Sequence, residues 1–506
     1  MMKQNPLPLE LALAQERIEK IAADFGLTFF RTVFEMVDYR QMNALAAYGG
    51  FPTRYPHYRF GMEYNQLSKS YEYGLHKIYE MVINNDPTYA YLLEGNTMLD
   101  QKLVMAHVYG HADFFRNNMY FSQTNRKMID AMANHATRIR RYQERYGVER
   151  VERFIDACLS VEDLIDPASI FRRTSPPREL SAGLEEEETM VPGRMPAKSY
   201  MDRYVNPPEY VRQQREKLAK RKEETRKFPR HPERDVLGFM MEHAPLDNWE
   251  RDVVGIIREE AYYFLPQRQT KVMNEGWASY WHSRIMTGKV LTDAEVIDYA
   301  DHHSGTVATQ PGRLNPYKLG LELFRDIERR WDMGQFGPAW EACESMAERN
   351  NWDRKTGAGR DKIFEVRRIH SDITFLDEFL TPEFCDAQRL FVSKNKDGKG
   401  QKAVVASREF KEVKQAMLFQ FSNGGRPVIE LVDANYANRS ELLLRHRHVG
   451  VDLRWDWAAD VLAQLNRIWR RPVRLETARD GKSVRLGHDG QNVTEEVFDK
   501  KKAAGS

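Results

Sequence analysis

Two histidines and one glutamate have spacings that suit a metal centre. His107 and His111 are four residues apart in an apolar stretch, so on a helix their imidazoles share one face about one turn apart. Glu275 lies in a second apolar stretch beside Trp277, where a buried carboxylate is costly unless a cation or a donor compensates its charge. We therefore expect His107, His111 and Glu275 to bind one divalent cation, either zinc or iron.

Each of these groups also has a simpler interpretation. With 14 histidines in the chain, a pair four residues apart can arise by chance, so both imidazoles can be ordinary helix residues. Glu275 can instead form a buried salt bridge with an arginine. The metal hypothesis rests on all three residues meeting in space.

Three further residues extend this hypothesis. His303 is the expected additional ligand, because it and its neighbour His302 point about 100° apart on a helix and only one can face the ion easily. His282 follows Glu275 by two helical turns, roughly 10 Å, which favours support of a ligand over direct binding. Arg313 lies in a turn and is expected to pair with an internal acid such as Glu275, or with a substrate carboxylate.

Metal-dependent hydrolysis would also need a general base. In zincin enzymes a glutamate directly follows the first histidine, and this chain has Val108 at that position. Glu259 and Glu260 are therefore the candidate catalytic residues, although only one of two adjacent helix side chains can face inward.

Three helices are expected to carry these residues. Thr97 begins a capping-box pattern before the first helix, which should end at residues 117–118. The second should span residues 252–264, with Pro266 as its stop. Thr270 should cap the third helix, which carries Glu275.

Four long, aromatic-rich strings resemble the SpoVR (stage V sporulation protein R) family, at residues 51–61, 107–118, 274–282 and 311–317. The resemblance extends from about residue 7 to residue 490. It implies a cytoplasmic bacterial protein that acts in spore cortex formation, or in stationary-phase and stress physiology, with no settled biochemical activity. It also implies a functional link to a PrkA-like serine protein kinase, and it supplies no catalytic residues.

Composition indicates a multi-domain chain inside the cell. The 506 residues exceed one typical core, and a net charge of +2 gives no general attraction to nucleic acid or to an anionic membrane. Three widely spaced cysteines suit a reducing compartment. The chain has no apolar run of membrane-spanning length and no signal-peptide pattern, so we expect a cytoplasmic protein without a membrane partner or a specific nucleic-acid partner. Composition leaves the oligomeric state open.

The expected fold is mainly α. Helical periodicity predicts a large helical domain at residues 1–385, and strand-like patterns predict a small α+β domain at residues 386–490, followed by a tail at 491–506. Prolines and charge runs at about 175–234 predict a mobile insertion or linker.

The expected C-terminal domain has the order strand, strand, helix, strand, which predicts one helix covering an antiparallel sheet. His446 and His448 alternate on its second strand, but the arginines beside them would repel a divalent cation. We interpret this strand as a basic sheet edge that discourages further pairing.

Two classes of function follow from these patterns. The absent zincin glutamate favours a regulator or scaffold that contains a metal site. The collection of acids and imidazoles favours a metal-dependent hydrolase acting on a peptide or peptidoglycan-precursor bond.

Overall fold

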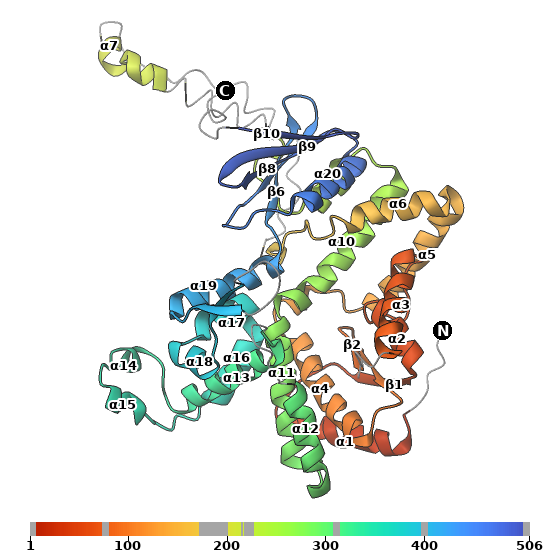
Figure 1. The fold of residues 1–506 in the computed structure, drawn as a ribbon, viewed down its shortest axis with the longest axis vertical. Helices are drawn as coiled ribbons and strands as arrows, with labels where there is room; N and C mark the ends of the chain where they lie inside the picture. The colour runs from red at the N-terminus through yellow and green to blue at the C-terminus, as the bar shows by residue number, and fades with distance from the viewer. Residues whose placement is uncertain are drawn as a thin grey trace. The chain divides into compact units, whose positions relative to one another are not determined.

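The computed structural model describes residues 7–72, 80–171, 201–213, 216, 227–306, 314–395 and 403–498. The chain forms two compact units that interleave along the sequence: residues 1–151 with 262–426, and residues 152–261 with 427–506. Helices dominate the first unit, and the second combines helices with a five-stranded sheet (Figure 1). The expected mainly α fold with a small C-terminal α+β part is confirmed. The predicted domain boundaries at residues 385 and 490 refer to parts of the chain that would fold independently, and they stay predictions.

Long helices packed around α11 form the centre of the first unit. Helix α11 (Lys271–Ile285) packs against both α4 (Met98–Asn117) and α13 (Pro316–Asp332) (Figure 1). Its Trp277 and Trp281 are fully buried in the main core of this unit. The other helices of the first unit are α1 (Leu9–Asp24), α2 (Tyr39–Ala47), α3 (Tyr58–Glu72), α5 (Met128–Tyr146), α12 (Val296–Thr306), α14 (Pro338–Glu341), α15 (Met346–Asn350), α16 (Gly359–Ile369), α17 (Asp372–Phe379), α18 (Pro382–Ala387) and α19 (Phe410–Phe421).

Helix α4 begins and ends as its sequence predicts. The Thr97 hydroxyl accepts a hydrogen bond from the Asp100 N–H at 3.1 Å, and the Asp100 carboxylate accepts one from the Thr97 N–H at 3.3 Å. The helix ends at Asn117, with Asn118 as its C-cap. Local capping therefore fixes the ends of the helix that carries both candidate histidines.

Two other helix boundaries differ from the prediction. Helix α10 (Asn248–Gln269) continues through Pro266, because a proline near the C-terminal end removes one N–H and leaves the earlier hydrogen bonds intact. Thr270 makes no side-chain cap of α11. Instead the carboxylate of Asp372, on α17, accepts two 2.9 Å hydrogen bonds from backbone N–H groups in the first turn of α11. Burial raises the pKa of Asp372 to about 7 in spite of these bonds.

The first unit also contains a three-stranded sheet that the helical periodicity concealed. Its order is β1 (Thr32–Val37), β3 (Thr88–Leu93), β2 (Glu80–Ile83), with β3 parallel to β1 and antiparallel to β2. The strands are rich in β-branched and aromatic residues, which favour extended backbone. Both β2 and β3 contact α4, so this sheet packs against the helix that carries the histidines. A separate hairpin pairs β4 (Val392–Asn395) with β5 (Ala403–Ser407).

The second unit is built on a mixed sheet with the order β10-β9-β8-β7-β6. Helix α20 (Trp455–Trp469) packs on β8 and β9. The expected purely antiparallel sheet is wrong, because β7 and β8 are parallel. Neighbouring parallel strands need a crossover connection, usually a helix, and α20 is such a connection between β7 and β8. The strands are β6 (Ile429–Tyr436), β7 (Glu441–His446), β8 (Val473–Arg479), β9 (Lys482–His488) and β10 (Val493–Val497).

The interpretation of the His446 strand as a sheet edge is also wrong. β7 lies between β6 and β8, and His446 is buried with its Nδ1 atom 2.9 Å from the hydroxyl of Thr477 on β8. His448 follows the strand and pairs with Asp452 at 2.7 Å. Each of the two histidines therefore has its own polar partner within the second unit.

Segments of residues 152–261 complete the second unit. They include α9 (Val236–His243), α7 (Asp202–Val205), the larger part of α6 (Val148–Leu159) and the first part of α10. Most of the insertion predicted at 175–234 lies outside the described residues. None of the helices in the described segments combines the length and the apolar character that crossing a membrane requires.

Candidate metal centre

Three of the expected ligands converge in the first unit. His107 and His111 lie on successive turns of α4, and Glu275 lies near the N-terminal end of α11. The Glu275 Oε2 atom is 3.6 Å from His107 Nε2 and 3.5 Å from His111 Nε2. One ligand atom from each residue lies within 4.8 Å of the other two. The side chains are 8%, 7% and 19% exposed, respectively, so the glutamate has the most access to solvent.

These distances suit a shared ion better than direct hydrogen bonds. Glu275 Oε2 is buried and has no hydrogen-bond partner among the described residues. Its separations from the two nitrogens exceed the usual N–H···O range. Two atoms that each bind a tetrahedral ion at about 2 Å are about 3.3 Å apart, close to the spacing found here.

The other ring nitrogen of each histidine is oriented by a polar neighbour. His111 Nδ1 lies 2.9 Å from Asn274 Oδ1, an acceptor, so this nitrogen carries the proton and donates. His107 Nδ1 lies 3.0 Å from His282 Nδ1, and one of these two nitrogens must be the donor. Where His107 donates, both neutral imidazoles direct an Nε2 lone pair at the carboxylate. Metal-binding histidines are commonly held in this way through the nitrogen that does not bind the ion.

Glycines allow α11 to approach both α4 and α13 closely. A Cβ atom on Gly110, between the two histidines, would lie 2.7 Å from the Ala278 Cα of α11. A Cβ atom on Gly276, next to Glu275, would lie 2.4 Å from the backbone of Gly320 on α13. Any side chain at these positions would separate the helices, because a non-bonded carbon pair needs about 3.5 Å. The sequence therefore places its smallest residues beside its candidate ligands.

The electrostatic surroundings favour an ionised Glu275. Burial raises the pKa of Glu275, but the positive charges of His107 and His111 in their protonated forms, together with that of Lys271, outweigh it and lower the pKa below its ordinary value. Among the described residues its ion-pair partners are the two histidines, so the alternative of a salt bridge to an arginine finds no partner there.

Of the other predicted residues, His282 contacts His107, as expected of a supporting residue, and Glu259 and Glu260 are not part of the three-ligand group found among the described residues. Glu260 is buried and Glu259 exposed, which agrees with the expectation that only one faces inward, but both belong to the part of α10 in the second unit. His303 lies on α12 with its side chain outside the described part of the structure, and Arg313 lies outside the described residues. Val108, at the position of the zincin base, is fully buried in the core.

Sequence reasoning missed Asn274 as a partner of a candidate ligand. The residue directly precedes Glu275, and only the pairing of α4 with α11 brings its amide to His111. Two aromatic rings that border the histidines were also missed: Tyr317 stacks on His107 at 6.3 Å, and Phe115 stacks on His111 at 5.9 Å. Phe115 follows His111 by one helical turn, a spacing that could have identified it.

Comparisons with known proteins identify the family of the chain. A family model described as SpoVR like protein matches residues 8–426, and a second, described as SpoVR-like C-terminal domain, matches residues 427–480. The chain belongs to the SpoVR family. The boundary between the two family models at residues 426 and 427 is also the second of the two points at which the chain passes from the first unit to the second.

One curated relative of this SpoVR-family protein covers nearly the whole chain. Uncharacterized protein YcgB of Escherichia coli (strain K12) is 30% identical over 505 residues, which are 94% of this chain and 93% of the relative. No solved structure matches the chain. Sequence similarity therefore establishes the family.

Proposed function

We propose that His107, His111 and Glu275 bind one divalent cation and that the protein acts as a regulator or scaffold whose helical unit depends on this ion. The observation that carries the proposal is the buried Glu275 Oε2 atom, which two imidazole Nε2 atoms face at 3.5 and 3.6 Å without a hydrogen bond. A cation between the three atoms would satisfy all of them at once.

Zinc fits this donor set best. Two imidazoles and one carboxylate are a common zinc ligand set, and the spacing near the tetrahedral value of about 3.3 Å supports that geometry. The same three groups also form the facial set of non-haem iron, which makes iron the second candidate. A bound zinc ion would supply Lewis-acid chemistry, the polarisation of a carbonyl group or of water.

The missing general base supports the regulatory role over the catalytic one. The position after His107 holds the buried Val108, so the zincin arrangement has no counterpart at that position of α4. A metal-dependent hydrolase acting on a peptide or peptidoglycan-precursor bond is the second candidate. It is favoured by the three protein ligands, since catalytic zinc sites keep one position for water, and by the partial exposure of Glu275. That role would also need a general base, for which the sequence offers Glu259 and Glu260.

The cellular setting of this proposal comes from the family. SpoVR-like proteins are linked to spore cortex formation and to stationary-phase or stress physiology, so we place this protein in the bacterial cytoplasm. A PrkA-like serine protein kinase is the proposed pathway partner. A metal-dependent helical unit suits such a role, because loss of the ion would loosen the pairing of α4 with α11.

Elemental analysis of protein purified without a histidine tag tests the metal proposal. We expect about one equivalent of zinc or iron in the wild type and its loss in Glu275→Gln, because a neutral amide is a poor ligand for a divalent cation. Glu328→Gln is the matched control, since Glu328 lies in the same unit with 14% exposure and pairs with Arg284. The proposal would be refuted by a wild type that contains no metal, or by a Glu275→Gln protein that contains as much metal as the Glu328→Gln control.

The same preparations separate the two roles. Under the regulatory role, Glu259→Gln and Glu260→Gln keep both the metal and the cellular phenotype of the wild type. Under the hydrolase role, one of them keeps metal and fold but loses the phenotype, because removal of a general base typically costs about 10²–10⁴ in rate.

A further inference from the structure

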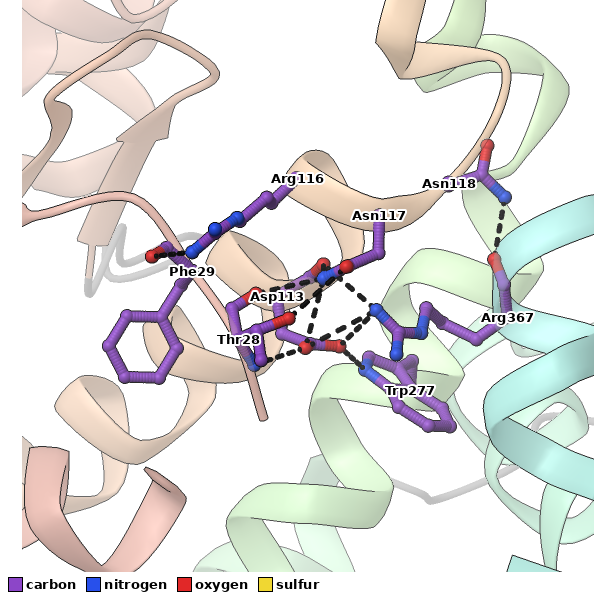
Figure 2. A network of polar contacts seen from close by, with 8 residues as sticks. All are labelled: Thr28, Phe29, Asp113, Arg116, Asn117, Asn118, Trp277 and Arg367. Carbon is purple, nitrogen blue, oxygen red and sulfur yellow. Dashed lines mark hydrogen bonds and ion pairs between the residues drawn. The ribbon is translucent and has the colours of Figure 1, made fainter. Parts of the chain in front are cut away.

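A fully buried carboxylate joins the two ligand-bearing helices away from the candidate metal centre. Asp113 of α4 accepts hydrogen bonds from the Trp277 indole N–H at 2.8 Å and from the Thr28 backbone N–H at 2.8 Å. The Arg367 guanidinium of α16 lies 3.2 Å from the same carboxylate. Figure 2 shows Asp113 at the centre of this network, with Trp277 and Arg367 directed toward it.

On each of the two helices, the residue that forms the hydrogen bond lies the same number of positions after the proposed metal-binding residue. Asp113 follows His111 by two residues, and Trp277 follows Glu275 by two residues. Side chains two residues apart on a helix point about 200° apart, so the hydrogen bond lies on the opposite side of each helix from the ligand. The close contact of Gly110 with Ala278 lies along the same pair of helices. One polar bond and one close packing contact thus fix the rotation of α4 against α11.

We propose that Asp113 is a positioning residue of the metal centre, acting through its hydrogen bond to Trp277. This inference rests on the metal binding proposed above. It adds two residues, Asp113 and Trp277, that are not among the three proposed metal-binding residues. Rotation of either helix would move its ligand atoms, and metal sites tolerate displacements of only a few tenths of an ångström. The Arg367 guanidinium compensates the buried Asp113 carboxylate, which is held in place where water does not reach it.

A matched pair of tryptophan variants isolates this hydrogen bond. Trp277→Phe removes the indole N–H that binds Asp113 and keeps an aromatic ring. Trp281→Phe removes the same group from the same helix and the same core, but the Trp281 indole nitrogen has no hydrogen-bond partner among the described residues. The two changes delete equal volume from fully buried positions, so they control for packing loss.

Three measurements on the full chain give the test: zinc affinity by chelator competition, the visible spectrum of the cobalt-loaded protein, and thermal unfolding without metal. We expect Trp277→Phe to bind zinc about tenfold more weakly, the lower end of what loss of a supporting partner costs, and to alter the cobalt spectrum. Trp281→Phe should retain both the wild-type affinity and the wild-type spectrum, whatever stability it loses. Asp113→Asn, which keeps an acceptor for Thr28, should resemble Trp277→Phe in spectrum.

Each outcome decides between the two proposals. A wild type that binds neither metal overturns the metal centre and the positioning role together. A wild type that binds metal, with Trp277→Phe and Trp281→Phe equal in affinity and spectrum, overturns the positioning role alone. If Asp113→Asn fails to fold, the tryptophan pair still gives the answer.

Discussion

The two units each contain a pair of histidines close in sequence, and they use them differently. In the second unit, His446 Nδ1 lies 2.9 Å from the Thr477 hydroxyl and His448 Nε2 lies 2.7 Å from Asp452. In the first unit, His107 and His111 have their Nδ1 atoms engaged and present their Nε2 atoms to Glu275. Sequence spacing brings two imidazoles close together in both units. Whether their ring nitrogens can bind a metal ion depends on which of these nitrogens already have hydrogen-bond partners within the protein.

The origin of the partners explains this contrast. The second pair is satisfied by a neighbouring strand and by a carboxylate four residues away, all within one small unit. The first pair meets a helix more than 160 residues distant in sequence, and that helix supplies both the Asn274 amide and the Glu275 carboxylate. A carboxylate placed opposite two lone pairs is unfavourable without a cation, whereas a hydroxyl beside one imidazole is not.

The largest effect that would sharpen the comparison is the loss of a ligand. His111→Ala should weaken zinc binding by more than about a hundredfold, beyond the range expected for a supporting partner. His446→Ala should leave the affinity unchanged, because its nitrogen is engaged within the second unit. Chelator competition measures both. Equal weakening by the two substitutions would erase the distinction between the pairs.

A smaller effect is expected from the partners of the histidines. Asn274→Leu removes the acceptor of His111 Nδ1 at similar volume and should weaken zinc binding by about 10–100-fold. Thr477→Val, which removes the hydroxyl beside His446, is the counterpart in the second unit and should have no effect on zinc. The same competition assay applies, and an unaffected Asn274→Leu would show that the amide does not orient the ligand.

Features of the fold and the site that depend on residues close together in the sequence could be predicted, whereas those that depend on residues far apart in the sequence could not. The capping box at Thr97 and the spacing of the two histidines are local, so the sequence alone indicated the helix and the paired face. Glu275 was found because a carboxylate among tryptophans is unusual. Asp113 and Arg367 are 254 residues apart and carry no local signal, so their pairing could not be predicted.

The sheets show the same limit. The strand Thr32–Val37 alternates weakly within a helical region, and its parallel partner begins more than 50 residues later. The parallel pairing of β7 with β8 also escaped prediction, although the intervening helix was expected, because the sheet was predicted to be antiparallel and a helical connection allows the next strand to run parallel.

The smallest expected effect concerns pH and the second pair. Burial lowers the pKa of His446, with His448 acting in the same direction and Asp452 against it. Below about pH 6.5 the unfolded chain then binds a proton more readily than the folded chain, so stability is lost as the pH falls. Unfolding midpoints should drop more between pH 7.5 and 5.5 for the wild type than for His446→Gln. Parallel decreases in both proteins would contradict this assignment.

The interleaving of the two units means that the second unit cannot finish folding until the segment after residue 427 has been synthesised. Residues 152–261 leave the ribosome before residues 262–426, yet they belong to a unit whose sheet is encoded after residue 427. The backbone bonds between Glu233 and Leu431, and the ion pair of Glu250 with Arg470, cannot form until the end of the chain has emerged. At typical elongation rates the early segment waits on the order of ten seconds with apolar surface uncovered. A chain that stops before residue 427 therefore contains all the segments of the first unit and lacks the sheet of the second.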